Sequence, residues 1–321
     1  MKKYIIAVSG GLDSITLLYL LVKLTSGEAD LSDRPELDEL VKLNITDKSQ
    51  IIAVHVNHQI RPDSDKTEDF VRRICEKYQV QFYSTKLKLK NTSEDEARRG
   101  RYLALNNAKL KFKASAIITA HNQNDAMETA IINLVRGTGW RGVCALNSTE
   151  QIIRPLINLS RLEITKIAAE TNLIWHEDST NSDESYLRNK IRKSILPKFS
   201  KDETQQLSLI INNLGIIKKD VDAIFKEIIE HSEEGFSLLR SQITSPGFSK
   251  KMLTEALIYI LPKLGATYDK KVVASLSEFC LSAVNGKKFM QAGNGIVVDC
   301  IRIGKDYQLK FRGSPSISRT S

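Results

Sequence analysis

Short apolar runs alternate with amphipathic segments along the first half of the chain. Residues 4–8 are apolar and end at a Gly-Gly pair, and residues 15–22 after it are apolar on nearly every side. This order predicts a buried strand, a tight turn and a buried helix. The alternation then continues, with strands predicted at 51–54, 81–87 and 116–120 and helices at 70–78, 94–109 and from Asp125 onward. Strands that alternate with helices predict an α/β fold, an open doubly wound parallel sheet covered on both faces.

The second half has a different pattern, mainly helical with terminal β-hairpins. Helices are predicted from a capping box Ser160-x-x-Glu163, at 186–196 before Pro197, and at 202–230, 248–261 and 272–284. Short Val/Ile-rich runs separated by Gly-containing turns then indicate hairpins. We expect domains at 1–200 and 201–312, with a disordered tail at 313–321. The loosely patterned, mostly acidic stretch 26–48 predicts a surface insertion.

Composition narrows the class of protein. The chain has 321 residues, which suits two domains, and its 41% hydrophobic and 26% charged residues are typical of a globular protein and exclude a disordered one. The apolar start is too short for a signal core or a membrane span, so we expect a cytoplasmic protein. The formal charge of +9 suits a polyanionic partner without naming it, and a merely solvated basic surface is the alternative.

Four cysteines, Cys75, Cys144, Cys280 and Cys300, lie far apart without a C-x-x-C pair. This spacing suggests neither a disulfide framework nor a zinc ribbon or iron–sulfur site. We expect buried thiols.

The loop Ser9-Gly10-Gly11-Leu12-Asp13-Ser14 lies where a parallel strand gives way to a helix, the usual ligand crevice of open α/β sheets. Its glycines allow close approach to an anion, and N–H groups at the helix start favour phosphate, to which the two serine hydroxyls can add hydrogen bonds. Asp13 would repel a bare phosphate, so it indicates Mg²⁺ held between carboxylate and phosphates. The alternative is a structural Gly-Gly turn with a capping side chain.

Asp125, Glu128 and Thr129 follow the end of another predicted strand at helical spacing, so they share one helix face beside the same crevice. A carboxylate pair suits an ammonium-bearing substrate. We expect Asp125 to hold or deprotonate its amine and Glu128 to assist or to bind metal. The alternative is that the helix dipole alone favours acidic residues in this turn.

Three histidines, His55, His58 and His121, fall just after predicted strands. We expect nucleotide contacts for His55 and a proton-relay role for His121, with a structural histidine as the alternative. Zinc binding by His55-x-x-His58 would need further ligands.

The loop S-G-G-x-D-S resembles the pyrophosphate loop of the N-type ATP pyrophosphatases, which cleave ATP between its α- and β-phosphates to adenylate a carbonyl oxygen. Further motifs follow it: His55-Val56-Asn57-His58, Glu94-x-x-Ala97-Arg98-x-x-Arg101-Tyr102, Ala120-His121-x-x-x-Asp125-x-x-Glu128-Thr129, Arg136-Gly137-Thr138-Gly139, Arg154-Pro155-Leu156, Asp178-x-Thr180-Asn181 and Tyr186-x-Arg188-Asn189-x-x-Arg192. In order and spacing this set resembles the tRNA(Ile)-lysidine synthetases over about the first 200 residues.

The resemblance implies a Rossmann-like ATP-pyrophosphatase catalytic domain over 1–200 and a tRNA-binding region over 201–312. It implies a ligase that adenylates the wobble cytidine of tRNA(Ile) with a CAU anticodon. The ε-amine of free L-lysine then displaces AMP to give lysidine, which switches decoding from AUG to AUA. ATP and Mg²⁺ are the implied cofactors, and a homodimer stays open.

The expected site residues follow from the motifs. For catalysis they are Asp13, Asp125, Glu128 and His121; for ATP binding, Ser9, Gly10, Gly11, Leu12, Asp13, Ser14 and His55; for Mg²⁺, Asp13; and for tRNA binding, Arg98, Arg101, Arg188, Lys190, Arg192 and Lys193. The arginine pair on one helical turn suits bidentate phosphate contact, and the basic run from 188 onward is either a phosphate track or a solvated helix face. The target base could stack on one of four aromatic residues, Tyr102, Trp140, Trp175 or Tyr186.

The chain departs from the family pattern A-H-H-x-D-D-Q-A-E-T, because Asn122, Asn124, Ala126 and Met127 fill its variable positions. A role that needs two adjacent aspartates is therefore not expected. The nearest rival, a tRNA thiolase of the same group, normally needs paired or catalytic cysteines. GMP-synthetase-like or NAD-synthetase-like amidation fits the basic charge less well. A non-catalytic nucleotide-binding module would not need the three carboxylates together.

Overall fold

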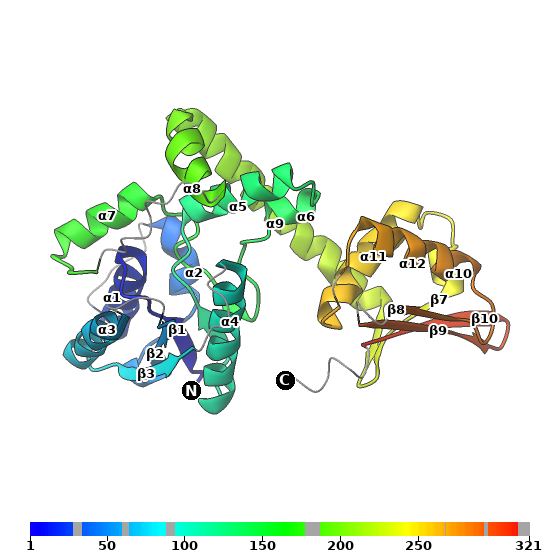
Figure 1. The fold of residues 1–321 in the computed structure, drawn as a ribbon, viewed down its shortest axis with the longest axis horizontal. Coiled ribbons are helices and arrows are strands. Elements are labelled where there is room, and N and C mark those ends of the chain that lie inside the picture. The colour runs from blue at the N-terminus through cyan, green and yellow to red at the C-terminus, as the bar shows by residue number, and fades with distance from the viewer. Residues whose placement is uncertain are drawn as a thin grey trace. The chain divides into compact units, whose positions relative to one another are not determined.

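The computed structural model describes residues 1–27, 34–59, 64–87, 94–176, 187–266, 268–291 and 295–313. They divide into two compact units, Met1–Gly215 and Ile216–Ser321 (Figure 1). The division falls inside the long helix α9 (Lys201–Ile228), whose start coincides with the expected boundary at residue 200. Of the expected tail only Gly313 is described, as the last residue of a strand.

The first unit is built on a parallel sheet. Among the described residues it has five strands in the order β3-β2-β1-β4-β5, and every pairing is parallel. The strands are β1 (Tyr4–Ala7), β2 (Ile51–Asn57), β3 (Gln81–Lys86), β4 (Ala116–Ile118) and β5 (Ile152–Ile153). This confirms the predicted doubly wound sheet. The order reverses between β1 and β4, where open α/β sheets place their ligand crevice.

Helices cover both faces of this sheet (Figure 1). The longer ones are α1 (Leu12–Ser26), α3 (Ser64–Tyr78), α4 (Glu94–Lys111), α5 (Gln123–Val135) and α7 (Arg161–Glu170). Ile6 of β1 packs into a core with α1, α3 and α7, whereas its neighbour Ile5 packs with α4. Successive strand residues face opposite sides, so one apolar run supplies both cores. The sequence Ser93-x-x-Glu96 is also typical of a capping box at the start of α4, but Ser93 lies outside the described residues.

The predicted surface insertion at 26–48 is wrong for its later part. Residues 34–48 contain the 3-10 turn η1 (Pro35–Leu37) and the short helix α2 (Asp38–Val41), followed by the 3-10 turn η2 (Lys48–Gln50). Leu37 and Leu40 are fully buried in the core on the α1 face of the sheet. These leucines are three residues apart, which is helical spacing, but the acidic residues between them made the segment look exposed in the sequence.

The predicted helix at 186–196 is irregular in its described part. The chain forms α8 (Leu187–Lys190), a π-helical stretch η4 (Ile191–Ile195) and a 3-10 turn η5 (Leu196–Lys198). Pro197 lies within that last turn instead of ending the helix, and the chain becomes extended at Phe199. Residue 186 and the motif at 178–181 lie outside the described residues.

The second unit combines helices with an antiparallel sheet. Within its described residues the strands follow the order β6-β7-β10-β9-β8, all antiparallel. Its elements are β6 (Glu230–Ser232), β7 (Gly235–Leu239), α10 (Arg240–Ile243), α11 (Lys250–Lys263), α12 (Lys270–Ser282), β8 (Lys288–Gln291), β9 (Ile296–Ile303) and β10 (Asp306–Gly313). Hairpins are confirmed in this part by β9 and β10, which pair on either side of Gly304, whereas the β6–β7 hairpin was not predicted. None of the helices that the structure describes is long and apolar enough to cross a membrane.

Candidate functional site

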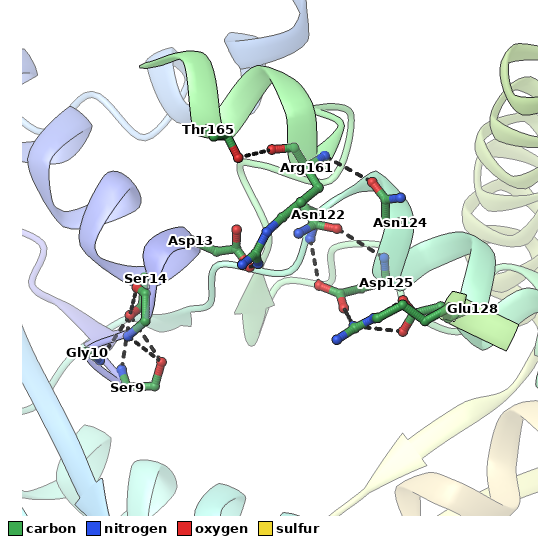
Figure 2. Close-up of polar contacts among 12 residues, drawn as sticks. Ser9, Gly10, Asp13, Ser14, Asn122, Asn124, Asp125, Glu128, Arg161 and Thr165 are labelled. Carbon is green, nitrogen blue, oxygen red and sulfur yellow. Dashed lines mark hydrogen bonds and ion pairs between the residues drawn. The ribbon is translucent and has the colours of Figure 1, made fainter. Parts of the chain in front are cut away.

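The loop 9–14 is organised by the hydroxyl of Ser14. The backbone N–H groups of Ser9 and Gly10 both donate to Ser14 Oγ at 3.2 Å, and this hydroxyl donates to the carbonyl of Gly11 at 2.9 Å (Figure 2). The chain thus turns around a buried side chain and enters α1 with Gly11 as its N-cap. The first N–H groups of a helix have no partner within it, so they can serve an anion in the crevice.

Gly10 is required by its backbone and by its neighbours. Its φ is +92°, and a Cβ there would meet Thr67 Cγ2 at 3.0 Å and Val71 Cγ2 at 3.2 Å, both on α3. Its carbonyl accepts the backbone N–H of His176 at 2.9 Å. The sequence predicted that this glycine allows close approach to an anion. The structure shows that it also lets the loop pack against α3.

Asp13 lies in the first turn of α1 with its side chain 20% exposed. Its Oδ2 accepts a hydrogen bond from Arg161 Nη1 at 2.5 Å, and its buried Oδ1 accepts none from the residues that the structure describes. Burial raises the pKa of Asp13 to about 6, Arg161 opposes this shift, and the neighbouring Asp125 adds to it. The carboxylate therefore sits where a further positive charge would be favourable.

The start of α5 is fixed by Asn122. Its Oδ1 accepts the backbone N–H of Asp125 at 3.0 Å, and Asp125 Oδ2 accepts the backbone N–H of Asn122 at 3.1 Å (Figure 2). Asn124 Oδ1 accepts the backbone N–H of Arg161 at 2.9 Å and so ties the start of α7 to that of α5. The asparagines that depart from the family pattern are thus a helix cap and a tether between helices.

Glu128 is fully buried and holds two guanidinium groups. Arg192 donates to its two oxygens at 2.6 and 3.0 Å and reaches Asp125 Oδ1 at 3.3 Å, and Arg188 Nε lies 3.4 Å from Glu128 Oε2. Burial raises the pKa of Glu128 and the paired arginine opposes that shift. Asp125 and Glu128 therefore form a cation site, filled in this structure by Arg192.

Two histidines are held neutral beside the crevice. His121 Nδ1 lies 2.8 Å from Thr119 Oγ1, and burial, reinforced by Arg154 and two further arginines, lowers its pKa to about 4. His55 Nδ1 donates to the carbonyl of Val8 at 2.8 Å, and burial lowers its pKa too. Neutral imidazoles can accept protons or hydrogen bonds from a ligand.

A crevice of about 730 Å³ joins these groups at the carboxyl ends of β1, β2 and β4. The predicted site residues that line it are Ser9, Gly11, Leu12, Asp13, Ser14, His55, Arg101, His121 and Arg192. Asp125 and Glu128 reach it through Arg192. Of the predicted stacking residues, Tyr102 and Trp175 line it as the structure describes it and Trp140 does not.

The predicted phosphate track divides into two kinds of residue. Arg188 and Arg192 contact Glu128, whereas Lys190 and Lys193 are exposed. Arg98 stacks over the ring of Tyr102, with its guanidinium carbon 5.3 Å from the ring centre. A tRNA phosphate would have to compete with Glu128 for the two arginines.

The cysteines do not form part of this site. All four are buried, and none lines the crevice in the part of the chain that the structure describes. Burial raises the pKa of Cys75 and of Cys280 to about 12, which opposes formation of a thiolate. Within the described residues no three His, Cys, Asp or Glu side chains are grouped to hold a metal, so zinc at His55 and His58 finds no further ligand there.

Sequence reasoning missed Arg161, and it cited Arg154 only as part of a motif. Arg154 is buried and donates to the carbonyl of Asn147 at 2.9 Å, and its charge is felt at His121. Arg161 opens α7, where a basic residue opposes the helix dipole. That unfavourable placement was the available signal.

Comparison with known proteins agrees with this geometry. The chain is 29% identical to a tRNA(Ile)-lysidine synthase of Clostridium acetobutylicum over 95% of this chain and 67% of that protein. It is 37% identical to one of Clostridium tetani, over 66% of this chain and 44% of the relative. The chain thus spans about half to two thirds of the length of these relatives. The resemblance seen in the motifs is confirmed.

A solved structure of a U34-tRNA thiolase from Methanococcus maripaludis with its [4Fe-4S] cluster covers 66% of this chain and 66% of that chain, at a TM-score of 0.42 and 20% identity. A likeness at that level does not decide between functions. The PP-loop domain family matches residues 1–199, which hold the loop, the sheet and the crevice. The chain therefore belongs to the PP-loop domain family.

Proposed function

We propose that this chain is a tRNA(Ile)-lysidine synthetase. In its first step the carbonyl oxygen of the wobble cytosine attacks the α-phosphorus of ATP, and pyrophosphate leaves. In its second step the ε-amine of free lysine attacks the activated carbon, loses a proton, and AMP leaves with the oxygen. The observation that carries the proposal is the crevice that brings the loop 9–14 together with Arg192, the side chain that the carboxylate pair on α5 holds.

The loop 9–14 binds the phosphates of ATP. Its helix-start N–H groups and the hydroxyl of Ser9 supply donors at the switch point of the sheet. His55 presents a neutral ring at the same mouth for the nucleoside, and Tyr102 and Trp175 offer aromatic surfaces to a base.

Asp13 fits a magnesium ion. Its buried Oδ1 lacks a hydrogen-bond donor among the described residues, and Mg²⁺ is often held by one carboxylate together with substrate phosphates. When bound there, the ion neutralises charge on the phosphates of ATP. Asp13 is the residue that would hold it.

The carboxylate pair on α5 binds the lysine amine. Asp125 and Glu128 already hold the guanidinium of Arg192, and an ammonium carries the same charge. Lysine therefore competes with Arg192 for Asp125, the more exposed of the two carboxylates. His121 lines the same crevice, and because its pKa is lowered to about 4 its neutral ring can accept a hydrogen bond from the amine.

The tRNA binds through basic side chains around this crevice and through residues 201–312. Arg101 lines the crevice, and Arg98 lies one helical turn before Arg101 on α4. Lys190 and Lys193 are exposed on the segment that carries Arg192. These groups suit the phosphates next to a splayed anticodon base. A second copy of the chain as partner stays a prediction.

The test is a reaction with ATP, Mg²⁺, labelled L-lysine and a tRNA(Ile) transcript with a CAU anticodon. We expect pyrophosphate, AMP and RNA-bound lysine to form in equal amounts. A matched transcript with U in place of the wobble C is the control and should give none of them. AMP formed without incorporation of lysine, or equal reaction of both transcripts, would refute the proposal.

A further inference from the structure

Arg161 stands out among the arginines that line the crevice. It is the first residue of α7, and the helix already has its own cap, because Ser160 Oγ accepts the backbone N–H of Glu163 and Glu163 accepts the backbone N–H of Ser160. A positive charge at a helix N-terminus is unfavourable to the helix. The helix itself therefore gives no reason for an arginine at this position.

The backbone of Arg161 is fixed while its side chain is accessible. Its N–H donates to Asn124 Oδ1 at 2.9 Å and its carbonyl accepts the hydroxyl of Thr165 at 2.8 Å (Figure 2). The side chain is 51% exposed and reaches into the crevice to Asp13. The guanidinium can therefore change partner without disturbing the core.

The partner of Arg161 is the carboxylate that the nucleotide needs. Arg161 Nη1 lies 2.5 Å from Asp13 Oδ2, in the loop that belongs to the PP-loop family match. Arg192, in contrast, makes three contacts with two carboxylates, one of them fully buried. Because one half-exposed ion pair holds it, Arg161 can exchange its partner more readily than Arg192 can.

We propose that Arg161 is a nucleotide-binding residue that changes partner: it pairs with Asp13 while the crevice holds no nucleotide, and it binds the phosphates beyond the α-phosphate of ATP when Asp13 turns to Mg²⁺. A polyphosphate carries more negative charge than one carboxylate and accepts bidentate hydrogen bonds from a guanidinium. Asp13 and Arg161 thus each have a partner of opposite charge both before and after the nucleotide binds. The inference rests on ATP use within the proposed function but on neither its lysine step nor its tRNA step.

The test is equilibrium binding of ATP, ADP and AMP to the full chain, by calorimetry, with Mg²⁺ and with a chelator instead. We expect Arg161→Ala to weaken ATP binding about tenfold or more with Mg²⁺ and AMP binding less than twofold. With the chelator the difference between variant and wild type should shrink to about twofold, because Arg161 then stays on Asp13. Arg161→Lys, which keeps the charge without the fork, should lie between the two.

Lys166→Ala is the matched control, since it removes an exposed positive charge from the same helix. Thermal unfolding of each variant verifies that it is folded. Equal weakening of all three nucleotides would overturn the proposal by making Arg161 a support for the start of α7, and so would unchanged ATP binding or a loss that persists with the chelator. The experiment contains no tRNA and no lysine, so its result does not depend on whether the chain makes lysidine.

Discussion

On one side of the crevice Asp13 meets a single half-exposed guanidinium, whereas on the other Glu128 and Asp125 share the multiply bonded Arg192. We call the first the loop side (residues 9–14 with Arg161) and the second the α5 side (residues 121–128 with Arg192). The loop side is shaped by backbone and small side chains, and its charge can change partner. The α5 side is shaped by buried charges, so removing one partner leaves the other buried without compensation.

The largest difference should appear in the two half-reactions. Asp13→Asn should lower the rate of pyrophosphate release at least about a hundredfold, because it removes the carboxylate that compensates the metal at the phosphates. Asp125→Asn should leave adenylation largely intact and impair transfer of lysine. Pyrophosphate release and RNA-bound lysine are measured in parallel. Equal loss of adenylation in both variants would show that Asp125 has been assigned to the wrong step.

The buried pair on the α5 side should dominate stability. Glu128→Gln should lower the free energy of unfolding by about 3 kcal/mol, because it removes the buried carboxylate that Arg192 and Arg188 both contact. Urea unfolding measures this. Asp38→Asn, in a pair with both side chains mostly exposed and 3.9 Å apart, should change it by less than about 0.5 kcal/mol. Similar losses of stability in both variants would contradict the expectation that a buried ion pair matters more than an exposed one.

His121 should make the α5 side sensitive to acid. Its pKa is lowered from 6.5 to about 4 in the folded chain, so the unfolded chain takes up a proton first as pH falls. The stabilisation is therefore complete above about pH 6.5 and is lost progressively toward pH 4. It amounts to about 2 kcal/mol, less than the full shift, because His121 is only partly buried. His121→Gln should flatten this part of the stability profile, and an unchanged slope would contradict the shift.

On the loop side, the free energy of unfolding should depend more on steric fit than on charge. Gly10→Ala forces a Cβ into a positive φ and against Thr67, so we expect a loss of about 2 kcal/mol in unfolding free energy. Gly11→Ala is the matched comparison. Its φ is −78° and the nearest side-chain atom to its Cβ is Ser9 Oγ at 3.6 Å, so its cost should stay below about 1 kcal/mol. Equal costs would mean that α3 does not constrain Gly10.

Local pattern predicted much of the fold of the first unit. An apolar strand, a Gly-Gly turn and a helix follow one another within residues 4–26, so each element is specified by its neighbours. The short strand β6 fails that logic: its three residues, Glu230, His231 and Ser232, are polar and exposed, and it follows a long helix directly. Only pairing with β7 makes it a strand.

The sequence predicted the site residues that lie close together in motifs. It did not predict contacts between residues that are far apart along the chain. The loop 9–14 and the helix turn with Asp125 stand out in the sequence. The contact of Arg161 with Asp13 joins two segments far apart along the chain, and so does that of Arg192 with Glu128. Sequence alone therefore predicted Arg192 as a phosphate ligand, and the structure gives it a carboxylate partner.

Among the residues of the crevice, Arg161 should have the smallest effect on the free energy of unfolding. Arg161→Ala breaks one ion pair whose cation is half exposed, so the free energy of unfolding should fall by only about 0.5 kcal/mol in the absence of nucleotide. Asp13 limits the loss further, because its pKa is already raised to about 6 and its charge can be given up by protonation. Urea unfolding with Lys166→Ala as control measures this small change. A loss near that of Glu128→Gln would mean that the loop side, too, depends on a fixed charge pair, and the contrast between the two sides would fail.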